Sequence, residues 1–284
     1  MHKGLLSFIG GLSQVILAKA QMTNRYLIFI VLCPVPRDSR YNCSNMKKEI
    51  LIFRYFPTEG PGYFAEFLDQ RGIPHRTIKV DQDEPVPESI ADFPGLVFMG
   101  GPMSVNDSLP WIPKLLRLIR QAVAADVPVL GHCLGSQLMS KALGGRVRRH
   151  RVKEIGWLPV QTIDSSEASQ WLYGLPSVFE AFHWHGETFS LPPGATHILK
   201  SRHCRNQGFV IGKSLALQCH IEMTPDMVRT WAHAGTREIA NAQPSVTVQR
   251  RARLLQGLPA RNARLHRIAD VFYEHWIKGL VRSL

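Results

Sequence analysis

The chain has 284 residues and a mass of 32.0 kDa, which is enough for one large domain or for a domain with appendages. Hydrophobic residues make up 45% of the chain and charged residues 20%, and these ordinary globular values exclude wholesale disorder. No run of about 18 apolar residues occurs and the five cysteines are irregularly spaced, so the sequence predicts neither a membrane-spanning helix nor a disulfide scaffold.

The formal net charge of +12 is concentrated at the two ends of the chain. Residues 1–48 hold seven basic residues and one acidic residue, and residues 229–284 hold ten basic and three acidic residues. The middle of the chain is therefore nearly neutral. No aromatic residues alternate with the basic ones, as a stacking surface for nucleic acid would require. We expect neither nucleic acid nor a membrane as a partner.

Residues 1–48 are predicted to be a dispensable N-terminal extension. The weakly apolar stretch 4–18, followed by Ala18-Lys19-Ala20, has the outline of a signal peptide, but serines, a glutamine and three glycines dilute it. In the alternative interpretation the working protein begins at Met46, directly before the apolar run 50–53. We favour the second interpretation, which places the protein in the cytoplasm.

From residue 49 onward, short apolar runs alternate with amphipathic segments. The predicted strands cover 50–55, 75–80, 95–99 and 127–130. The predicted helices run from the turn at 60–62 to Gly72, from 110 to 125, and from 134 to 143. This alternation predicts an α/β fold with a mostly parallel central sheet flanked by helices. Ligands of such sheets bind at the carboxyl ends of the strands.

The second half of the chain is richer in predicted strands, at 146–152, 156–160, 178–184, 197–201, 208–211 and 215–219. Thr224 followed by Pro225 is a strong helix start. The tail carries an apolar stripe at helical spacing, which is expected to pack on the sheet: Leu265, Ile268, Ala269, Phe272, Trp276 and Leu280. The predicted organisation is one domain at 49–235, with C-terminal helices at 236–284 packed on it.

The sharpest motif is 131–137, Gly-His-Cys-Leu-Gly-Ser-Gln, which places Cys133 between a buried strand and a helix. A strand-turn-helix elbow exposes its central side chain above the sheet, and small neighbours permit the tight turn. The start of the helix stabilises a thiolate and offers free backbone N–H groups to an oxyanion. This pattern predicts a nucleophile, although a buried inert cysteine is the commoner alternative.

His220 and Glu222 end the last predicted strand before the Thr224 helix. A histidine at that edge can act as a general base, and an acid two residues later can hold its ring. The Gly100-Gly101-Pro102 turn follows another strand, and its N–H groups could join that of Leu134 in an oxyanion hole. Together these motifs predict a Cys-His-Glu triad.

In their order and spacing, these motifs resemble those of a class I glutamine amidotransferase domain over about residues 49–230. The chain is most similar to stand-alone members akin to the amidotransferase domain of GMP synthetase, which have a flavodoxin-like architecture. Further matching segments are Lys153-Glu154-Ile155-Gly156-Trp157, His183-Trp184-His185-Gly186-Glu187 and Asn206-Gln207-Gly208-Phe209. The family often has Phe and Pro where this chain has Cys219 and Ile221.

The resemblance implies that Cys133 attacks the glutamine carboxamide, that His220 moves the proton and that Glu222 orients His220. It implies that Gly101 and Leu134 hold the oxyanion. It also implies that substrate is bound by Gly100, Gln137, His185 and Gly186. No cofactor and no metal are implied. Glutamine, or a γ-glutamyl small molecule, is the expected substrate, and an acceptor-domain protein acting in trans is the expected kind of protein partner.

Several alternatives stay open. The same triad would suit a γ-glutamyl peptidase or hydrolase with water as acceptor, and a regulatory binding module without turnover belongs to another class of function. His183 and His185 with His132 could form a metal site, although no further ligand completes it convincingly. Cys219 is expected to point into the core, away from the predicted base, and Cys204 is expected to be structural.

The basic run at 146–153 is predicted to be a solvated edge strand kept from pairing by its charge. The alternative is a docking site for an anionic acceptor or a partner. Strand alternation would then place Arg149 and Arg151 on one face, and Arg148 and His150 on the other.

Overall fold

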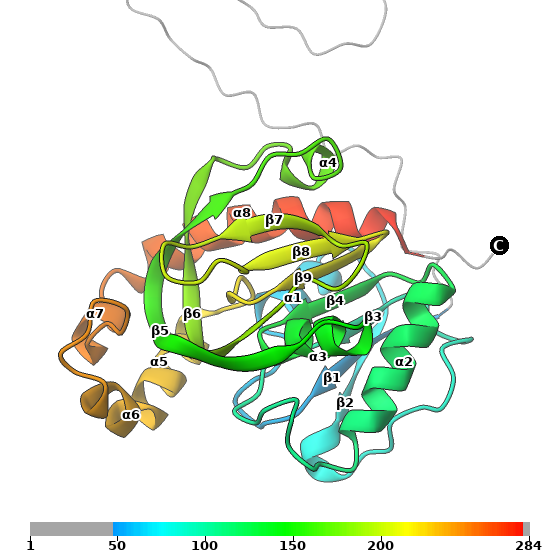
Figure 1. Ribbon diagram of the computed structural model, residues 1–284, viewed down its shortest axis with the longest axis horizontal. Helices are drawn as coiled ribbons and strands as arrows, with labels where there is room; N and C mark the ends of the chain where they lie inside the picture. Colours follow the sequence, from blue (N-terminus) through cyan, green and yellow to red (C-terminus); the bar gives the residue numbers. More distant parts are fainter. Residues whose placement is uncertain (1–47, 281–284) are drawn as a thin grey trace, which may run out of the picture. The chain divides into compact units, whose positions relative to one another are not determined.

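The structure, a computed structural model, describes residues 48–280, so the predicted extension at 1–48 lies almost wholly outside the described residues. One mixed sheet of nine strands runs through these residues in the order β2-β1-β3-β4-β9-β8-β7-β5-β6 (Figure 1). Helices cover both of its faces. The predicted α/β fold with a central sheet flanked by helices is therefore confirmed.

Parallel pairing holds from β2 to β9, and this half of the sheet carries the predicted elbow. Its strands are short, and all except the edge strand β2 are buried along nearly their whole length, as expected for strands covered on both faces. They are β1 (Ile50–Arg54), β2 (His75–Lys79), β3 (Leu96–Phe98), β4 (Val129–His132) and β9 (Ser214–Leu217). All five carboxyl ends lie at the same edge of the sheet.

Antiparallel strands continue the sheet beyond β9: β8 (Gly208–Ile211), β7 (Thr196–Lys200), β5 (Val147–Thr162) and β6 (Val178–Phe189). The two strands predicted at 146–152 and 156–160 are one 16-residue strand, because both parts pair with β6. The pairing register shifts between Arg149 and Glu154, so the basic run lies at an irregularity of the ladder.

Two apolar layers enclose the sheet. One layer contains side chains of α2 (Ile112–Ala124) and α3 (Leu134–Ala142). The other contains those of α1 (Tyr63–Asp69), α5 (Pro225–Ala234) and α8 (Leu258–Lys278), and Figure 1 shows α3 and α8 on opposite sides of the sheet. The remaining short helices are η2 (Val80–Gln82), α4 (Ser169–Leu172), α6 (Thr236–Asn241) and α7 (Arg251–Leu255).

The chain beyond residue 235 belongs to the same core. The apolar stripe on α8 is buried there, as its spacing predicts, and Val248 bridges to Ile155 of β5. The predicted helix start at Thr224 is also present, with the threonine hydroxyl accepting from the N–H of Met227 at 3.3 Å.

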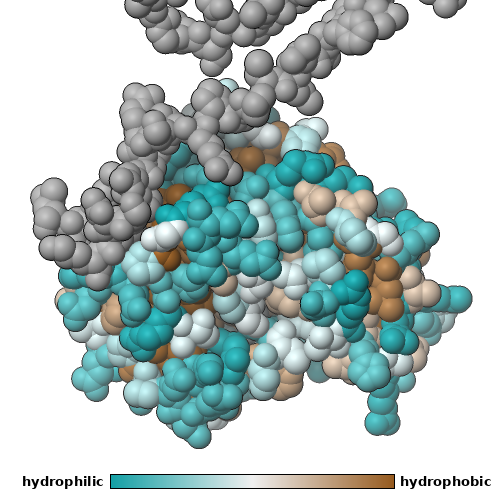
Figure 2. All heavy atoms as spheres, turned by 180° about the vertical axis from the view of Figure 1, so that it is seen from behind, coloured by the Kyte–Doolittle hydropathy of each residue, from teal (hydrophilic) through white to brown (hydrophobic). Residues whose placement is uncertain are grey.

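Hydrophilic residues predominate among the coloured atoms of the face in Figure 2. No helix of residues 48–280 is long and apolar enough to cross a membrane.

Trp276 tests the contribution of α8 to the core. Its side chain is fully buried, and its ring lies 5.7 Å from that of Phe64 on α1. We expect Trp276→Ala to lower the free energy of unfolding by about 3–5 kcal/mol, because it leaves a large cavity. Urea denaturation followed by fluorescence or circular dichroism measures this change. Tyr173→Ala, at a side chain that is 86% exposed, is the control and should leave the midpoint nearly unchanged.

Candidate functional site

Cys133 occupies the turn between the end of β4 and the start of α3. Its backbone has φ 48° and ψ −105°, a conformation that costs a non-glycine residue about 1–3 kcal/mol. The flanking glycines permit the turn. A Cβ on Gly131 would stand 2.6 Å from the carbonyl carbon of Gly135, and a Cβ on Gly135 would collide with the carbonyl oxygen of Phe98. The sequence thus places the cysteine at a strained elbow, as predicted.

The Cys133 side chain is nearly buried but opens on a cavity. Its sulfur lies 3.5 Å from the side-chain nitrogen of Gln218, and the side-chain oxygen of Gln218 accepts from the amide nitrogen of Gln137 at 3.1 Å. Within residues 48–280, the backbone N–H groups of Gly101 and Leu134 have no acceptor. Two donors are therefore available where the motif predicts an oxyanion hole.

His220 and Glu222 follow β9 and are both buried. Nδ1 of His220 lies 2.6 Å from the Glu222 carboxylate. The other carboxylate oxygen lies 3.1 Å from Nδ1 of His132, the residue directly before the elbow. The indole ring of Trp231 packs edge-on against the His220 ring, 4.9 Å between centroids. Glu222 thus joins two histidines that come from neighbouring strands.

The charges of this cluster stabilise one another. Burial would lower the pKa of His220, but the charges of Glu222 and Cys133 hold it well above its usual value. Burial would raise the pKa of Glu222, but His132 and His220 hold it well below its usual value. The imidazole of His220 is therefore protonated, and the carboxyl of Glu222 ionised, near neutral pH.

The cavity in front of Cys133 has a volume of about 720 Å³. The predicted binding residues Gln137, His185 and Gly186 line it together with Gly101. Gly100 is not one of the lining residues and lies beside Glu59 and His220. Carboxylates of Glu59, Glu187 and Glu238 also line the cavity. Residues from the separate sequence motifs therefore line one cavity, with the exception of Gly100.

Arg149, His150, Arg151, Val152 and Lys153 all line the same cavity. The pairing register shifts between Arg149 and Glu154, so the alternation of these side chains between two faces stays a prediction. Within the described part of the chain, neither Arg149 nor Arg151 has an ion pair, whereas Lys153 pairs with Glu238 of α6. The mouth of the cavity thus carries unpaired positive charge.

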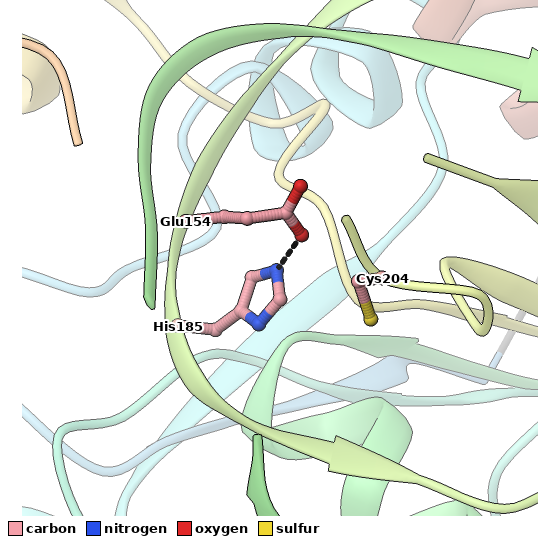
Figure 3. A group of neighbouring side chains, drawn as sticks. All are labelled: Glu154, His185 and Cys204. Carbon is pink, nitrogen blue, oxygen red and sulfur yellow. Dashed lines mark ion pairs between the residues drawn. The ribbon is translucent and has the colours of Figure 1, made fainter. Parts of the chain in front are cut away.

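His185 contacts a buried cluster of polar side chains that the sequence motifs did not predict. Its Nδ1 faces the carbonyl of Glu187 at 3.1 Å, and its Nε2 lies 3.1 Å from Glu154 (Figure 3). Ser201 and Gln207 donate to the same carboxylate at 2.8 and 2.7 Å. Burial would raise the pKa of Glu154, but its bond to His185 and nearby charges lower it to about 2.

Glu154, His185 and Cys204 offer ligand atoms within 4.8 Å of one another, close enough to hold a metal ion. The carboxylate is already bonded on both oxygens, and burial raises the pKa of the Cys204 thiol to about 11. The cluster is therefore satisfied by its own contacts. His183 and His132, the other histidines of the metal alternative, are not members of this group.

Cys133 is predicted to be the cysteine that reacts with electrophiles. Cys219 is fully buried, and that burial raises the pKa of its thiol far above the usual value. We expect a glutamine-like electrophile to label the peptide that contains Cys133 at neutral pH, and Cys133→Ala to abolish that label. Mass spectrometry of the digested protein identifies the labelled peptide. Cys219→Ala is the matched control, and loss of labelling in that variant alone would contradict the assignment.

Comparison with known proteins gives consistent matches. A family model described as glutamine amidotransferase class-I matches residues 65–230. The glutamine amidotransferase-like protein YfeJ of Salmonella typhimurium is 31% identical over 191 residues, which cover 65% of this chain and 80% of that protein. One polypeptide of the glutamine-hydrolyzing GMP synthase of Sulfolobus acidocaldarius is 34% identical over 117 residues, 40% of this chain and only 57% of that polypeptide.

Two solved structures extend the likeness to the fold. The glutamine amidotransferase of Methylobacillus flagellatus superposes with a TM-score of 0.81 and 45% identity, covering 84% of this chain and 97% of that one. A glutamine amidotransferase of Thermotoga maritima gives a TM-score of 0.73 and 26% identity, covering 81% and 98%.

Proposed function

Because the chain belongs to the class I glutamine amidotransferase family, we propose that it hydrolyses the side-chain amide of glutamine through a thioester on Cys133. The observation that carries this proposal is the Cys133 elbow beside the buried His220–Glu222 pair, with 2.6 Å between the pair's nitrogen and oxygen. A nucleophile, a base and a group that orients the base are the elements of nucleophilic acyl transfer.

In the first half-reaction the Cys133 thiolate attacks the carboxamide carbon and forms a C–S bond. The carbonyl oxygen gains negative charge, which the N–H groups of Gly101 and Leu134 stabilise. The imidazolium of His220 donates its proton to the amide nitrogen, the C–N bond breaks, and ammonia leaves. Glutamyl thioester and neutral imidazole remain.

In the second half-reaction His220 takes a proton from water, and the resulting hydroxide adds to the thioester carbon. Collapse of the tetrahedral species breaks the C–S bond and releases glutamate. Glu222 stabilises the imidazolium in both halves, and His132 holds the second oxygen of Glu222 in place. Gln137, His185 and Gly186, which line the cavity, would bind the glutamyl part of the substrate.

The base can be tested by substitution. We expect His220→Asn to slow thioester formation by about 10²–10⁴-fold, because a positioned general acid or base contributes that much. Glu222→Gln should slow it less, since the amide still occupies the place of the group that orients the ring. Ammonia release and rapid-quench detection of the thioester measure both effects. Equal rates in His220→Asn and the unchanged protein would eliminate the triad, and absence of turnover in the unchanged protein would favour a regulatory binding module.

A second candidate is hydrolysis of a γ-glutamyl compound larger than glutamine. The cavity volume of about 720 Å³ and the two unpaired arginines at its mouth favour it. Such a substrate would pass through the same thioester, with an amine that carries an anionic group leaving in place of ammonia. The GMP synthases among the relatives suggest a third candidate. In it, the ammonia released from glutamine passes to a synthetase partner that acts in trans.

The two arginines separate these candidates. We expect Arg149→Ser combined with Arg151→Ser to leave kcat/KM for glutamine within about twofold, because no triad residue changes. For a γ-glutamyl dipeptide with a free carboxylate, kcat/KM should fall and lose its dependence on salt, since screening acts over about 8 Å at physiological ionic strength. Equal losses for the two substrates would contradict a selective role for the arginines.

A further inference from the structure

One of the three cavity carboxyl groups differs from the other two in its contacts. Glu187 accepts from the hydroxyl of Ser104 at 3.0 Å, and Glu238 accepts from the indole N–H of Trp184 at 3.0 Å. Glu59 also lines the cavity, yet within residues 48–280 its carboxyl makes no hydrogen bond and no ion pair. It lies before residue 65, where the match to the family model begins.

The backbone that carries Glu59 is fixed to the catalytic elements. Its own N–H donates to the carbonyl of Phe56 at 3.0 Å, and the indole N–H of Trp231 donates to Thr58 at 2.8 Å. At the end of this loop the N–H of Tyr63 donates to the backbone oxygen of Glu222 at 2.8 Å. The loop between β1 and α1 is thus held by α5 on one side and by the base-bearing segment on the other.

The Glu59 carboxyl lies beside the catalytic histidine. A Cβ built on Gly100 would stand 2.5 Å from Oε2 of Glu59 and 3.2 Å from Cε1 of His220. Both atoms therefore flank the same backbone carbon. Cε1 is the ring carbon between Nδ1, which binds Glu222, and Nε2, so the carboxyl lies near the part of the ring where imidazolium charge is spread.

Other charged and titratable groups around His220 come from each element packed against it. Glu222 and Cys219 share its own segment, and Cys133 and His132 come from the end of β4. His183 comes from β6, Tyr273 from α8, and α5 contributes the uncharged ring of Trp231. Burial lowers the pKa of His183 to about 3, so that histidine stays neutral.

Glu59 itself titrates near neutral pH. Burial raises the pKa of Glu59 to about 7, the charge of His220 lowers it, and the charge of Glu222 raises it again. Glu222 and Cys219 keep one protonation state across the neutral range, because the pKa of Glu222 is lowered and that of Cys219 is raised.

We propose that Glu59 is a fourth ionisable group of this centre, a positioning residue whose ionised carboxyl stabilises the imidazolium form of His220. Its effect on turnover rests on the proposed function, but its electrostatic coupling to His220 does not. As the pH rises through neutrality Glu59 gains a negative charge, which favours the protonated ring. The imidazolium that protonates the leaving nitrogen therefore persists to higher pH than Glu222 alone would permit.

The coupling can be measured without turnover. In protein labelled with ¹³C at histidine Cε1, the His220 signal, assigned by its loss in His220→Asn, should show an inflection near pH 7 from Glu59. Glu59→Gln should remove that inflection. Glu66→Gln, an exposed glutamate on α1, is the matched control and should retain it. A His220 titration curve that is the same in Glu59→Gln and the unchanged protein would overturn the proposal.

Kinetics give the second readout. In Glu59→Gln the basic limb of kcat/KM should move to lower pH by about half a unit to one unit, because a nearby charge no longer favours the imidazolium. Glu59→Asp keeps the charge one methylene further back and should give a smaller shift; it also serves if Glu59→Gln does not fold. An inflection without glutamine hydrolysis would support the coupling of Glu59 to His220 and refute the proposed function. Glutamine hydrolysis without the inflection would support the proposed function and refute the coupling.

Discussion

The buried carboxylate of Glu222 is the group on which the rest of the site depends. An ionised carboxylate far from water is costly unless charged and hydrogen-bonding partners surround it. Here the partners of the carboxylate are His220 at 2.6 Å and His132 at 3.1 Å, and the backbone oxygen of the same residue accepts from the N–H of Tyr63. Tyr273 of α8 in turn lies 3.4 Å from His132. One negative charge therefore links the end of β4 to the segment after β9 and, through His132, to the C-terminal helix. A change in any of these can alter the protonation of His220.

Backbone strain at Cys133 is the second constraint. The turn with this positive φ is closely packed, because a Cβ on Gly131 would meet Gly135 and a Cβ on Gly135 would meet Phe98. The strain places the sulfur at the start of α3, where unpaired N–H groups are available. Strand β3 has a structural part in this, because the carbonyl of Met99 accepts from Gly135 at 3.1 Å and ties the elbow to the Gly-Gly-Pro turn.

Features that depend on residues close together in the sequence could be predicted, whereas contacts between residues far apart in the sequence could not. The elbow and the His-x-Glu pair are local patterns, and the fold follows from the alternation of apolar runs with amphipathic segments. The contact of His132 with Glu222 joins residues ninety positions apart, and Glu59 reaches His220 only because α5 and β9 hold its loop. Such contacts depend on which segments meet in space. The register shift after Arg149 is of the same kind, because the sequence alone shows a regular alternation there.

The division of the sheet into a parallel and an antiparallel half has an evolutionary consequence. Cys133 and His220 follow the parallel strands β4 and β9, whereas antiparallel strands β5 and β6 contribute other residues that line the cavity. The irregular segment after Arg149 can accept substitutions or insertions with little effect on the pairing that fixes Cys133 and His220. Homologues could therefore diverge in the compounds they accept while keeping one chemistry, and the length and charge of β5 would be the first place to look for that divergence.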